Sequence, residues 1–155
     1  MEKIVFNPSE KPTVGIEVEA QLVDNSSGDL VNIAEGIIKQ YSNEDRVKHE
    51  LYLSTVEITS SPLMNTNDTY KELSSIFKKV LEIANKENAG LISAGSHPFA
   101  MYEDQVITDV NPRYEEFADK YGWAVRRLLT FGMHVHVGID SKEKAIAIHD
   151  EIRKY

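Results

Sequence analysis

Residues 13–23 alternate apolar and polar side chains along their whole length, and this pattern constrains the fold more than any other. Successive side chains of a β-strand point to opposite faces, so the pattern predicts a strand with one buried face. The apolar face consists of Val14, Ile16, Val18, Ala20 and Leu22, and the other face carries Gly15, Glu17, Glu19 and Gln21. Acids are poor strand formers and repel each other on a shared face unless a cation or hydrogen-bond donors lie between them. Glu17 and Glu19 therefore mark either a solvent-facing edge strand or a functional site.

A second alternating segment, residues 130–139, carries two histidines. Read as a strand, it places Met133, Val135 and Val137 on one face, and His134 and His136 on the other. Two imidazoles at this spacing can reach one point in front of the sheet, beside a metal ion or a phosphate group. The alternative is that they only form hydrogen bonds within a partly buried sheet.

A third segment, residues 47–60, is predicted to form a strand or a pair of strands. Glu57 lies between Val56 and Ile58 and is the only charged residue between positions 51 and 67, which favours a functional role. Glu50 follows the charged patch at residues 43–49, so the interpretation as a surface residue is stronger for Glu50 than for Glu57.

Taken together, these carboxylates and imidazoles suggest one site on one sheet face. Oxygen-rich sites suit Mg²⁺ or Mn²⁺, often shared with substrate phosphates, and the histidines shift the preference towards Mn²⁺ or Zn²⁺. The sequence has neither a Walker-type lysine loop nor a GxGxxG motif. If a nucleotide binds, metal-bridged phosphates on the sheet are therefore the expected mode.

Three weaker candidates lie elsewhere. His97 occupies the bend at residues 95–98, where it either faces the site or caps the turn. Arg113 and the pair Arg126 and Arg127 are candidate anion-binding residues, but adjacent helical arginines cannot both face the same way.

Helical spacing of apolar residues predicts helices at 34–41, 69–88 and 114–130, with a break at Gly122, and a last helix capped by Ser141. Asp68 or Asn67 is expected to cap the second helix and Gly90 to end it. Short strands are expected at 30–33 and 91–94. Alternating strands interspersed with helices favour an α+β fold with a mostly antiparallel sheet in one domain.

The composition excludes some classes of binding partner. A net charge of −8 argues against nucleic acid, because phosphate backbones are bound by basic surfaces. The chain has no cysteine, which excludes disulfides and thiolate chemistry and is compatible with the cytoplasm. No apolar run approaches the roughly 20 residues that cross a bilayer, so we expect a soluble protein that does not bind membranes.

Five segments resemble motifs of the type 2 glutamate–cysteine ligase family, also called carboxylate–amine ligases. They are residues 13–24, 50–58, 94–99, 111–114 and 132–138, and they occur in the order and spacing of that family. The resemblance implies a glutamine-synthetase-like fold in which an antiparallel sheet forms an open funnel. It also implies ATP-dependent amide formation between the γ-carboxylate of glutamate and an amine, cysteine being the first choice, through an acyl phosphate.

The resemblance also assigns residues. Metal and nucleotide positions match Glu17, Glu19, Glu50, Glu57 and one of His134 or His136, and a substrate-side motif matches Arg113. Family members are much longer, so residues 1–155 are expected to be the N-terminal part of a catalytic domain that lacks further strands, one metal carboxylate and substrate-binding arginines. We expect such a truncated chain to be inactive alone, and a homodimer is one way to cover its exposed sheet edges.

Two other hypotheses belong to different classes. The first is a small cupin-like enzyme that holds Fe, Mn or Zn on a barrel, although the long helices leave few strands for one. The second is a non-catalytic fragment that binds a metal ion or a partner without turnover.

Overall fold

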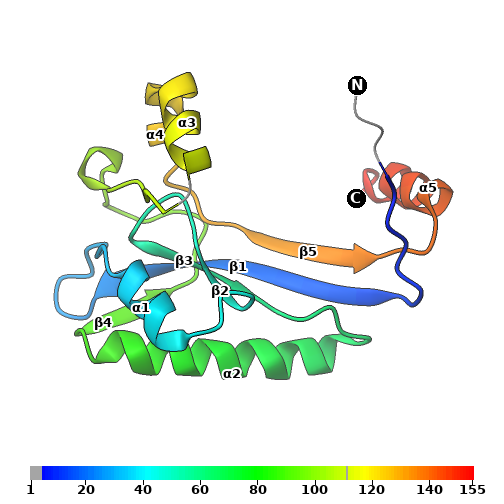
Figure 1. Cartoon of the computed structure of the whole chain (residues 1–155), viewed down its shortest axis with the longest axis horizontal. Coiled ribbons are helices and arrows are strands. Elements are labelled where there is room, and N and C mark those ends of the chain that lie inside the picture. Colours follow the sequence, from blue (N-terminus) through cyan, green and yellow to red (C-terminus); the bar gives the residue numbers. More distant parts are fainter. Residues whose placement is uncertain (1–4, 111) are drawn as a thin grey trace.

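The computed structural model describes residues 5–110 and 112–155, with the side chains of residues 113 and 115 also left aside. Strands and helices alternate along the chain (Figure 1). They are β1 (Thr13–Asp24), α1 (Ala34–Tyr41), β2 (Val47–His49), β3 (Thr55–Thr59), α2 (Thr66–Asn85), β4 (Ala89–Ile92), η1 (Tyr102–Asp104), α3 (Pro112–Tyr121), α4 (Trp123–Arg126), β5 (Met133–Gly138) and α5 (Lys142–Ile152). Every strand pair is antiparallel, which confirms the predicted α+β class.

The long strand β1 is the centre of the sheet. It pairs with β3 along one edge, and β3 pairs in turn with β2. Along its other edge, β1 pairs first with β5 and then with β4 (Figure 1). Strands far apart in the sequence therefore meet on the two sides of the segment whose alternation is clearest.

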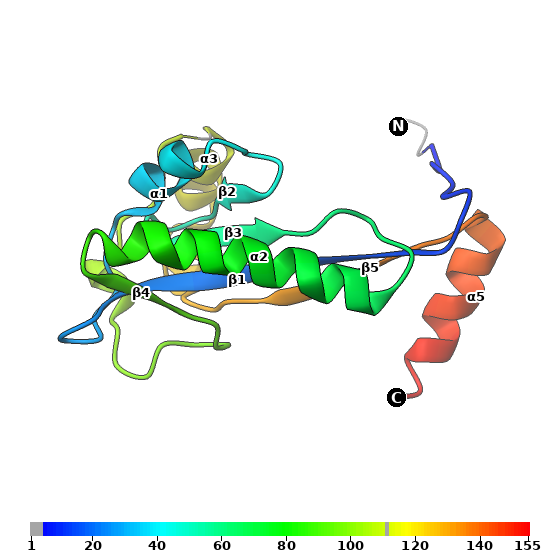
Figure 2. The same cartoon turned by 90° about the horizontal axis from the view of Figure 1, so that it is seen from below.

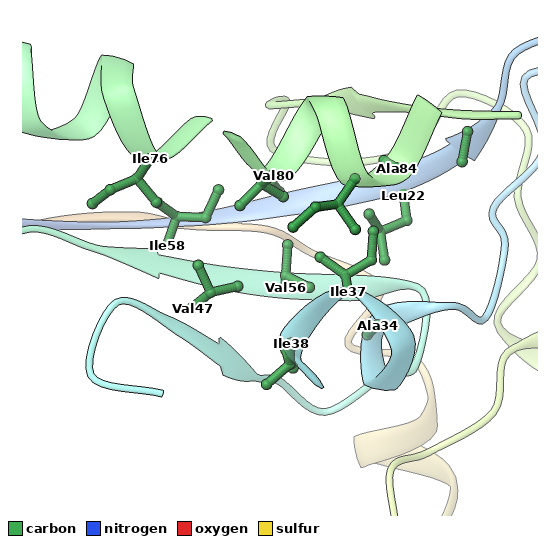
Figure 3. Close-up of a cluster of buried hydrophobic side chains, with 13 residues drawn as sticks. Leu22, Ala34, Ile37, Ile38, Val47, Val56, Ile58, Ile76, Val80 and Ala84 are labelled. Atoms are coloured by element: carbon green, nitrogen blue, oxygen red, sulfur yellow. The ribbon is translucent and has the colours of Figure 1, made fainter. Parts of the chain in front are cut away.

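One face of the sheet is covered by α1 and α2, and the main core lies between them and the sheet (Figure 3). Fully buried side chains from β1, β2 and β3 meet side chains from both helices there. They include Leu22, Ile37, Val47, Val56, Ile58 and Val80. Burial of the apolar face leaves the acidic face of β1 on the opposite side of the sheet.

Helix α2 begins earlier and ends earlier than the apolar periodicity predicts. Its cap is Asn65, whose side chain accepts a hydrogen bond from the Asp68 backbone N–H, so Asp68 lies within the first turn. The positive φ after the helix belongs to Asn88 (56°), while Gly90 lies in β4. The prediction that Gly90 ends the helix is wrong because asparagine also tolerates this conformation.

Other boundaries differ as well. Residues 30–33 form only an isolated bridge between Leu30 and Val23, because the chain turns directly into α1. The predicted helix at 114–130 does break at Gly122, where φ is 51°, but the second piece ends at Arg126. Its expected buried side is only partly buried, since Ala118 and Val125 are inside while Phe117, Tyr121 and Leu128 are exposed.

The apolar side chains of β5 lie on the same side of the sheet as those of β1 but are not covered. Met133, Val135 and Val137 are 69%, 57% and 57% exposed. Helix α5, which follows β5, has no buried residue and projects away from the sheet and α2 (Figure 2). No helix in the described chain is long and apolar enough to cross a membrane.

Candidate active site

Strand register brings the predicted acidic and imidazole side chains onto one face of the sheet. Glu19 lies opposite Glu57 across the β1–β3 pair, and Glu17 lies opposite His134 across the β1–β5 pair. His136 lies opposite Gly15, one step further along the same face. The prediction that three separate segments share one patch is therefore confirmed, because residues opposite each other in an antiparallel pair point to the same face.

Glu19, Glu57 and His134 of this face form one wall of a cavity of about 610 Å³, while Glu17 and His136 line a smaller cavity of about 300 Å³. Carboxylates and an imidazole line one part of the cavity, and apolar and aromatic side chains from α3 and the segment after α4 line the other. The lining residues are Glu19, Glu50, Leu51, Tyr52, Thr55, Glu57, Tyr114, Phe117, Leu128, Thr130, Phe131, Gly132 and His134. A concave, half-apolar cavity of this size with a cluster of polar groups is typical of a small-molecule site.

Groups of β5 and of the residue just before it contact both Glu17 and Glu19. Glu17 Oε2 lies 3.0 Å from His136 Nε2 and 3.7 Å from His134 Nδ1. Glu19 Oε2 accepts a hydrogen bond of 2.8 Å from the backbone N–H of Gly132. Both carboxylates are thereby held in position on the sheet face.

Glu57 is held by β2. Lys48 lies directly opposite Glu57 in the β2–β3 pair, and its Nζ is 3.1 Å from Glu57 Oε1. The Thr59 hydroxyl donates to the same oxygen at 3.2 Å. Lys48 was not predicted as a site residue, because in the sequence it belongs to a charged surface patch. The signal was its place two positions before Glu50, on the same face of a strand that turns back at residues 52–55.

Glu50 lies in the connection between β2 and β3 and faces the same cavity. The Tyr114 hydroxyl of α3 donates a 2.8 Å hydrogen bond to Glu50 Oε2. Burial raises the pKa of the Glu50 carboxyl, and the negative charges of Glu19 and Glu57 raise it further, while the bond from Tyr114 acts in the opposite direction. Glu50 is therefore part of the acidic cluster, and Tyr114 is a second site residue that the residue pattern did not single out.

Replacing Glu50 with glutamine is expected to stabilise the metal-free chain at neutral pH. A carboxyl whose pKa is raised by folding stabilises the folded state below its ordinary pKa of 4.5, and that contribution is lost as the pH rises through the raised value. Glutamine resembles the protonated acid and still accepts the bond from Tyr114. Thermal unfolding in EDTA from about pH 4 to about pH 8 should show a variant that melts a few degrees higher at neutral pH and no difference at the acid end.

Glu82→Gln, on the exposed side of α2, is the matched control and should leave the midpoint unchanged throughout. A stabilisation by Glu50→Gln that is the same at every pH would show that the charge of Glu50 is not its cause.

His97 lies apart from the other predicted site residues. Its Nε2 is 3.0 Å from the Gly28 carbonyl oxygen, and its Nδ1 accepts a hydrogen bond from the Ala100 backbone N–H at 3.1 Å. Nε2 thus joins the bend to the turn after β1, Nδ1 holds the backbone of the bend itself, and His97 does not line the cavity. We leave it out of the proposed site.

The described side chains of the candidate anion-binding arginines do not lie at the cavity. Arg113 lies in α3, but its side chain is outside the described residues. The Arg127 guanidinium lies over the Trp123 ring at 4.6 Å and the Tyr102 ring at 5.4 Å, and neither Arg126 nor Arg127 lines the cavity.

The donor set fits a divalent cation, although the side chains are not gathered as ligands. Within residues 5–110 and 112–155, no three Asp, Glu or His side chains converge on one point. Each carboxylate is instead engaged by a donor of the protein itself. Four carboxylates and two imidazoles on one face, with Glu19 and Glu57 close enough to raise the pKa of Glu50, nevertheless form a cluster whose repulsion a cation would relieve.

Comparisons with known proteins agree with this arrangement. A family model described as glutamate–cysteine ligase family 2 (GCS2) matches residues 13–155. A protein of Leifsonia xyli subsp. xyli with the provisional name glutamate–cysteine ligase 2 is 35% identical over 100% of this chain and 42% of its own length. A similarly named protein of Mycolicibacterium vanbaalenii is 38% identical over 94% of this chain and 38% of its own length.

Among solved structures, the chain is similar to the crystal structure of a glutamate–cysteine ligase from Francisella tularensis in complex with AMP. The TM-score is 0.69 at 15% identity, over 93% of this chain and 30% of that one. At this identity the likeness shows the fold. The chain spans about two fifths of the length of the curated relatives it matches.

Proposed function

This chain belongs to glutamate–cysteine ligase family 2, and we propose that it carries the metal and nucleotide half of a carboxylate–amine ligase site. The whole reaction would join the γ-carboxylate of glutamate to an amine, cysteine being the first candidate, at the expense of ATP. Because the chain spans about two fifths of its relatives, residues 1–155 would be the N-terminal part of the catalytic domain and inactive alone. The proposed reaction would take place in the cytoplasm, where ATP is supplied.

The observation that carries this proposal is the acidic face itself. ATP is strongly anionic, and the cavity wall presents Glu19, Glu50 and Glu57 beside it. Polyphosphate and carboxylates repel each other unless divalent cations lie between them. A cavity with this wall therefore suits a nucleotide that arrives with Mg²⁺ or Mn²⁺. It does not suit a free anion.

The residues that would hold the cations are those that share the face: Glu17, Glu19, Glu50, Glu57, His134 and His136. When bound, Mg²⁺ or Mn²⁺ would offset the negative charge of the phosphates. Gly132 would keep the Glu19 carboxylate oriented through its N–H, and the His136 contact would do the same for Glu17. The apolar wall around Phe117 and Phe131 would exclude water from the reacting groups.

In the proposed reaction, the γ-phosphoryl group of ATP passes to the glutamate γ-carboxylate and ADP leaves. The amine then attacks the acyl phosphate, an amide bond forms and phosphate is released. Arg113 would bind substrate, as the family resemblance implies. The Francisella protein of the same fold is described in complex with AMP, which supports adenine nucleotide as the ligand.

Thermal unfolding tests the proposal. Mg²⁺ with ATP should stabilise the chain more than either alone, by about 3 to 6 °C at about ten times the dissociation constant. Glu17→Gln should lose this gain, whereas Glu82→Gln should keep it. Stabilisation by Zn²⁺ or Fe²⁺ alone, with no further effect of ATP, would contradict the proposal.

Turnover tests whether the isolated chain is sufficient for catalysis. Phosphate release that depends on glutamate and an amine is expected to be absent from the isolated chain. Its appearance would show that residues 1–155 are sufficient for catalysis. A cupin-like enzyme is a poorer explanation, since the described strands form an open sheet with helices on one face.

A further inference from the structure

We propose that Lys48 occupies the place of a divalent cation in the metal-free site and gives up Glu57 when the cation binds. The inference rests on the proposed function, because it takes Glu57 to be a metal ligand. It assigns to Lys48 a positioning role that the acidic and imidazole residues do not share.

Strand pairing fixes Lys48 beside Glu57. The two residues are direct partners in the β2–β3 register, so both side chains rise from the same face as Glu19. Lys48 Nζ lies 3.1 Å from Glu57 Oε1 and 3.4 Å from Thr59 Oγ1. An ammonium group at this position contacts the oxygens that a bound cation would need.

Charge makes the position significant. Lys48 forms the only ion pair between a lysine or arginine and a site carboxylate within the part of the chain that the structure describes. Glu17 contacts histidines, Glu19 a backbone N–H and Glu50 a tyrosine hydroxyl. A single positive charge thus faces a cluster of carboxylates. Burial is the main cause that raises the pKa of Glu50, and the charges of Glu19 and Glu57 raise it further.

A second observation points to ligand binding beside Glu57. Thr55, which precedes Glu57 by two residues and lines the same cavity, is 1% exposed, and its hydroxyl has no hydrogen-bond partner in the described structure. Gln21, its neighbour across β1 and β3, has an amide oxygen in the same condition. Buried polar atoms are rarely left without partners, so a water molecule or a bound ligand is the expected partner of the Thr55 hydroxyl at the cavity wall.

Exchange of Lys48 for a cation is physically easy. The Lys48 side chain is 41% exposed and Glu57 19%, and the lysine stem is long and flexible. An ion pair whose lysine is this exposed contributes little to folding, so releasing the ammonium group costs little. The freed ammonium would remain on the same face, where it can contact a phosphate oxygen of a metal-bound nucleotide.

Mn²⁺ binding to the full chain without nucleotide, followed by electron paramagnetic resonance of free Mn²⁺, tests the inference. Lys48→Met should tighten binding by about threefold to tenfold, because the cation no longer competes with an ammonium group. Lys48→Arg, which keeps the charge, should bind as the unmodified chain does. Lys71→Met removes an exposed lysine paired with Asp68 and should have no effect.

A double-variant cycle separates this inference from the proposed function. Glu57→Gln should weaken Mn²⁺ binding, and in that background Lys48→Met should have no further effect. If Glu57→Gln weakens binding but Lys48→Met leaves it unchanged or weaker, Lys48 does not hold the cation's place. If neither the unmodified chain nor Lys48→Met binds Mn²⁺ measurably, or if Glu57→Gln binds it equally well, the metal site itself is refuted. Circular dichroism of each variant ensures that only folded chains are compared.

Discussion

Replacing Glu19 with glutamine should weaken Mn²⁺ or Mg²⁺ binding at least about tenfold and, in the same protein, raise its stability without metal. Glu19 lies at the middle of the acidic face, opposite Glu57 and close enough to raise the pKa of Glu50. The glutamine oxygen can still accept the bond from the Gly132 N–H, so the fold is kept while the charge is lost. Isothermal titration with the metal ion and thermal unfolding in EDTA measure the two effects.

A decrease in metal affinity together with an increase in metal-free stability identifies a functional carboxylate. A structural acid would lose stability on replacement, and a surface acid such as Glu82 would change neither quantity. If Glu19→Gln lowers the stability in EDTA and leaves metal affinity unchanged, Glu19 serves the fold and not the site.

Replacing Ile58 with alanine should cost about 2 to 5 kcal/mol of unfolding free energy, measured by urea unfolding. Ile58 is a fully buried residue of β3 in the core between the sheet and the helices (Figure 3). The large loss is expected because the packed side chains of the sheet and of the two helices prevent the cavity from closing.

Val135→Ala provides the contrast. Val135 is also an apolar strand residue on the same side of the sheet, but it is 57% exposed and should cost no more than about 0.5 kcal/mol. Equal losses at the two positions would mean that the apolar face of β5 is covered in solution.

Much of the fold could be predicted because alternation is a local property. The pattern at residues 13–23 identified β1 and assigned each side chain to a face, and the same reasoning placed His134 and His136 together. Parity alone then put Glu17, Glu19 and Glu57 on the side away from the core. The sequence predicted mostly antiparallel pairing, which the structure confirms, but it did not predict the order of the strands.

The ends of helices and strands, and the elements that cover them, were harder to predict because they depend on groups distant in the sequence. The end of α2 is set by Asn88 and by the pairing of β4 with β1, not by the glycine that follows. The exposure of β5 could not be predicted from its sequence, since Val135 lies in the same kind of alternating segment as the buried Val56. Covering elements decide burial, and α2 does not reach that strand.

The acids and imidazoles of the candidate site were predicted to share one sheet face, but the residues that contact them were not predicted. Spacing places Lys48 on the same strand face as Glu50, but its contact with Glu57 follows only from the register of β2 and β3. Tyr114 reaches Glu50 from a helix far along the chain. His97 has the residue type of a site histidine, but its two ring nitrogens are engaged by backbone groups.

A map of Mn²⁺ proximity by nuclear magnetic resonance tests most directly whether these three strands form one metal site. Small amounts of Mn²⁺ added to ¹⁵N-labelled chain should broaden the amide signals around Glu17 and Glu19 in β1, Glu57 in β3 and His134 in β5 before any others. Broadening that begins instead at the exposed acids of α5, such as Asp150 and Glu151, or that spreads evenly over the chain, would contradict a shared metal site on the sheet face.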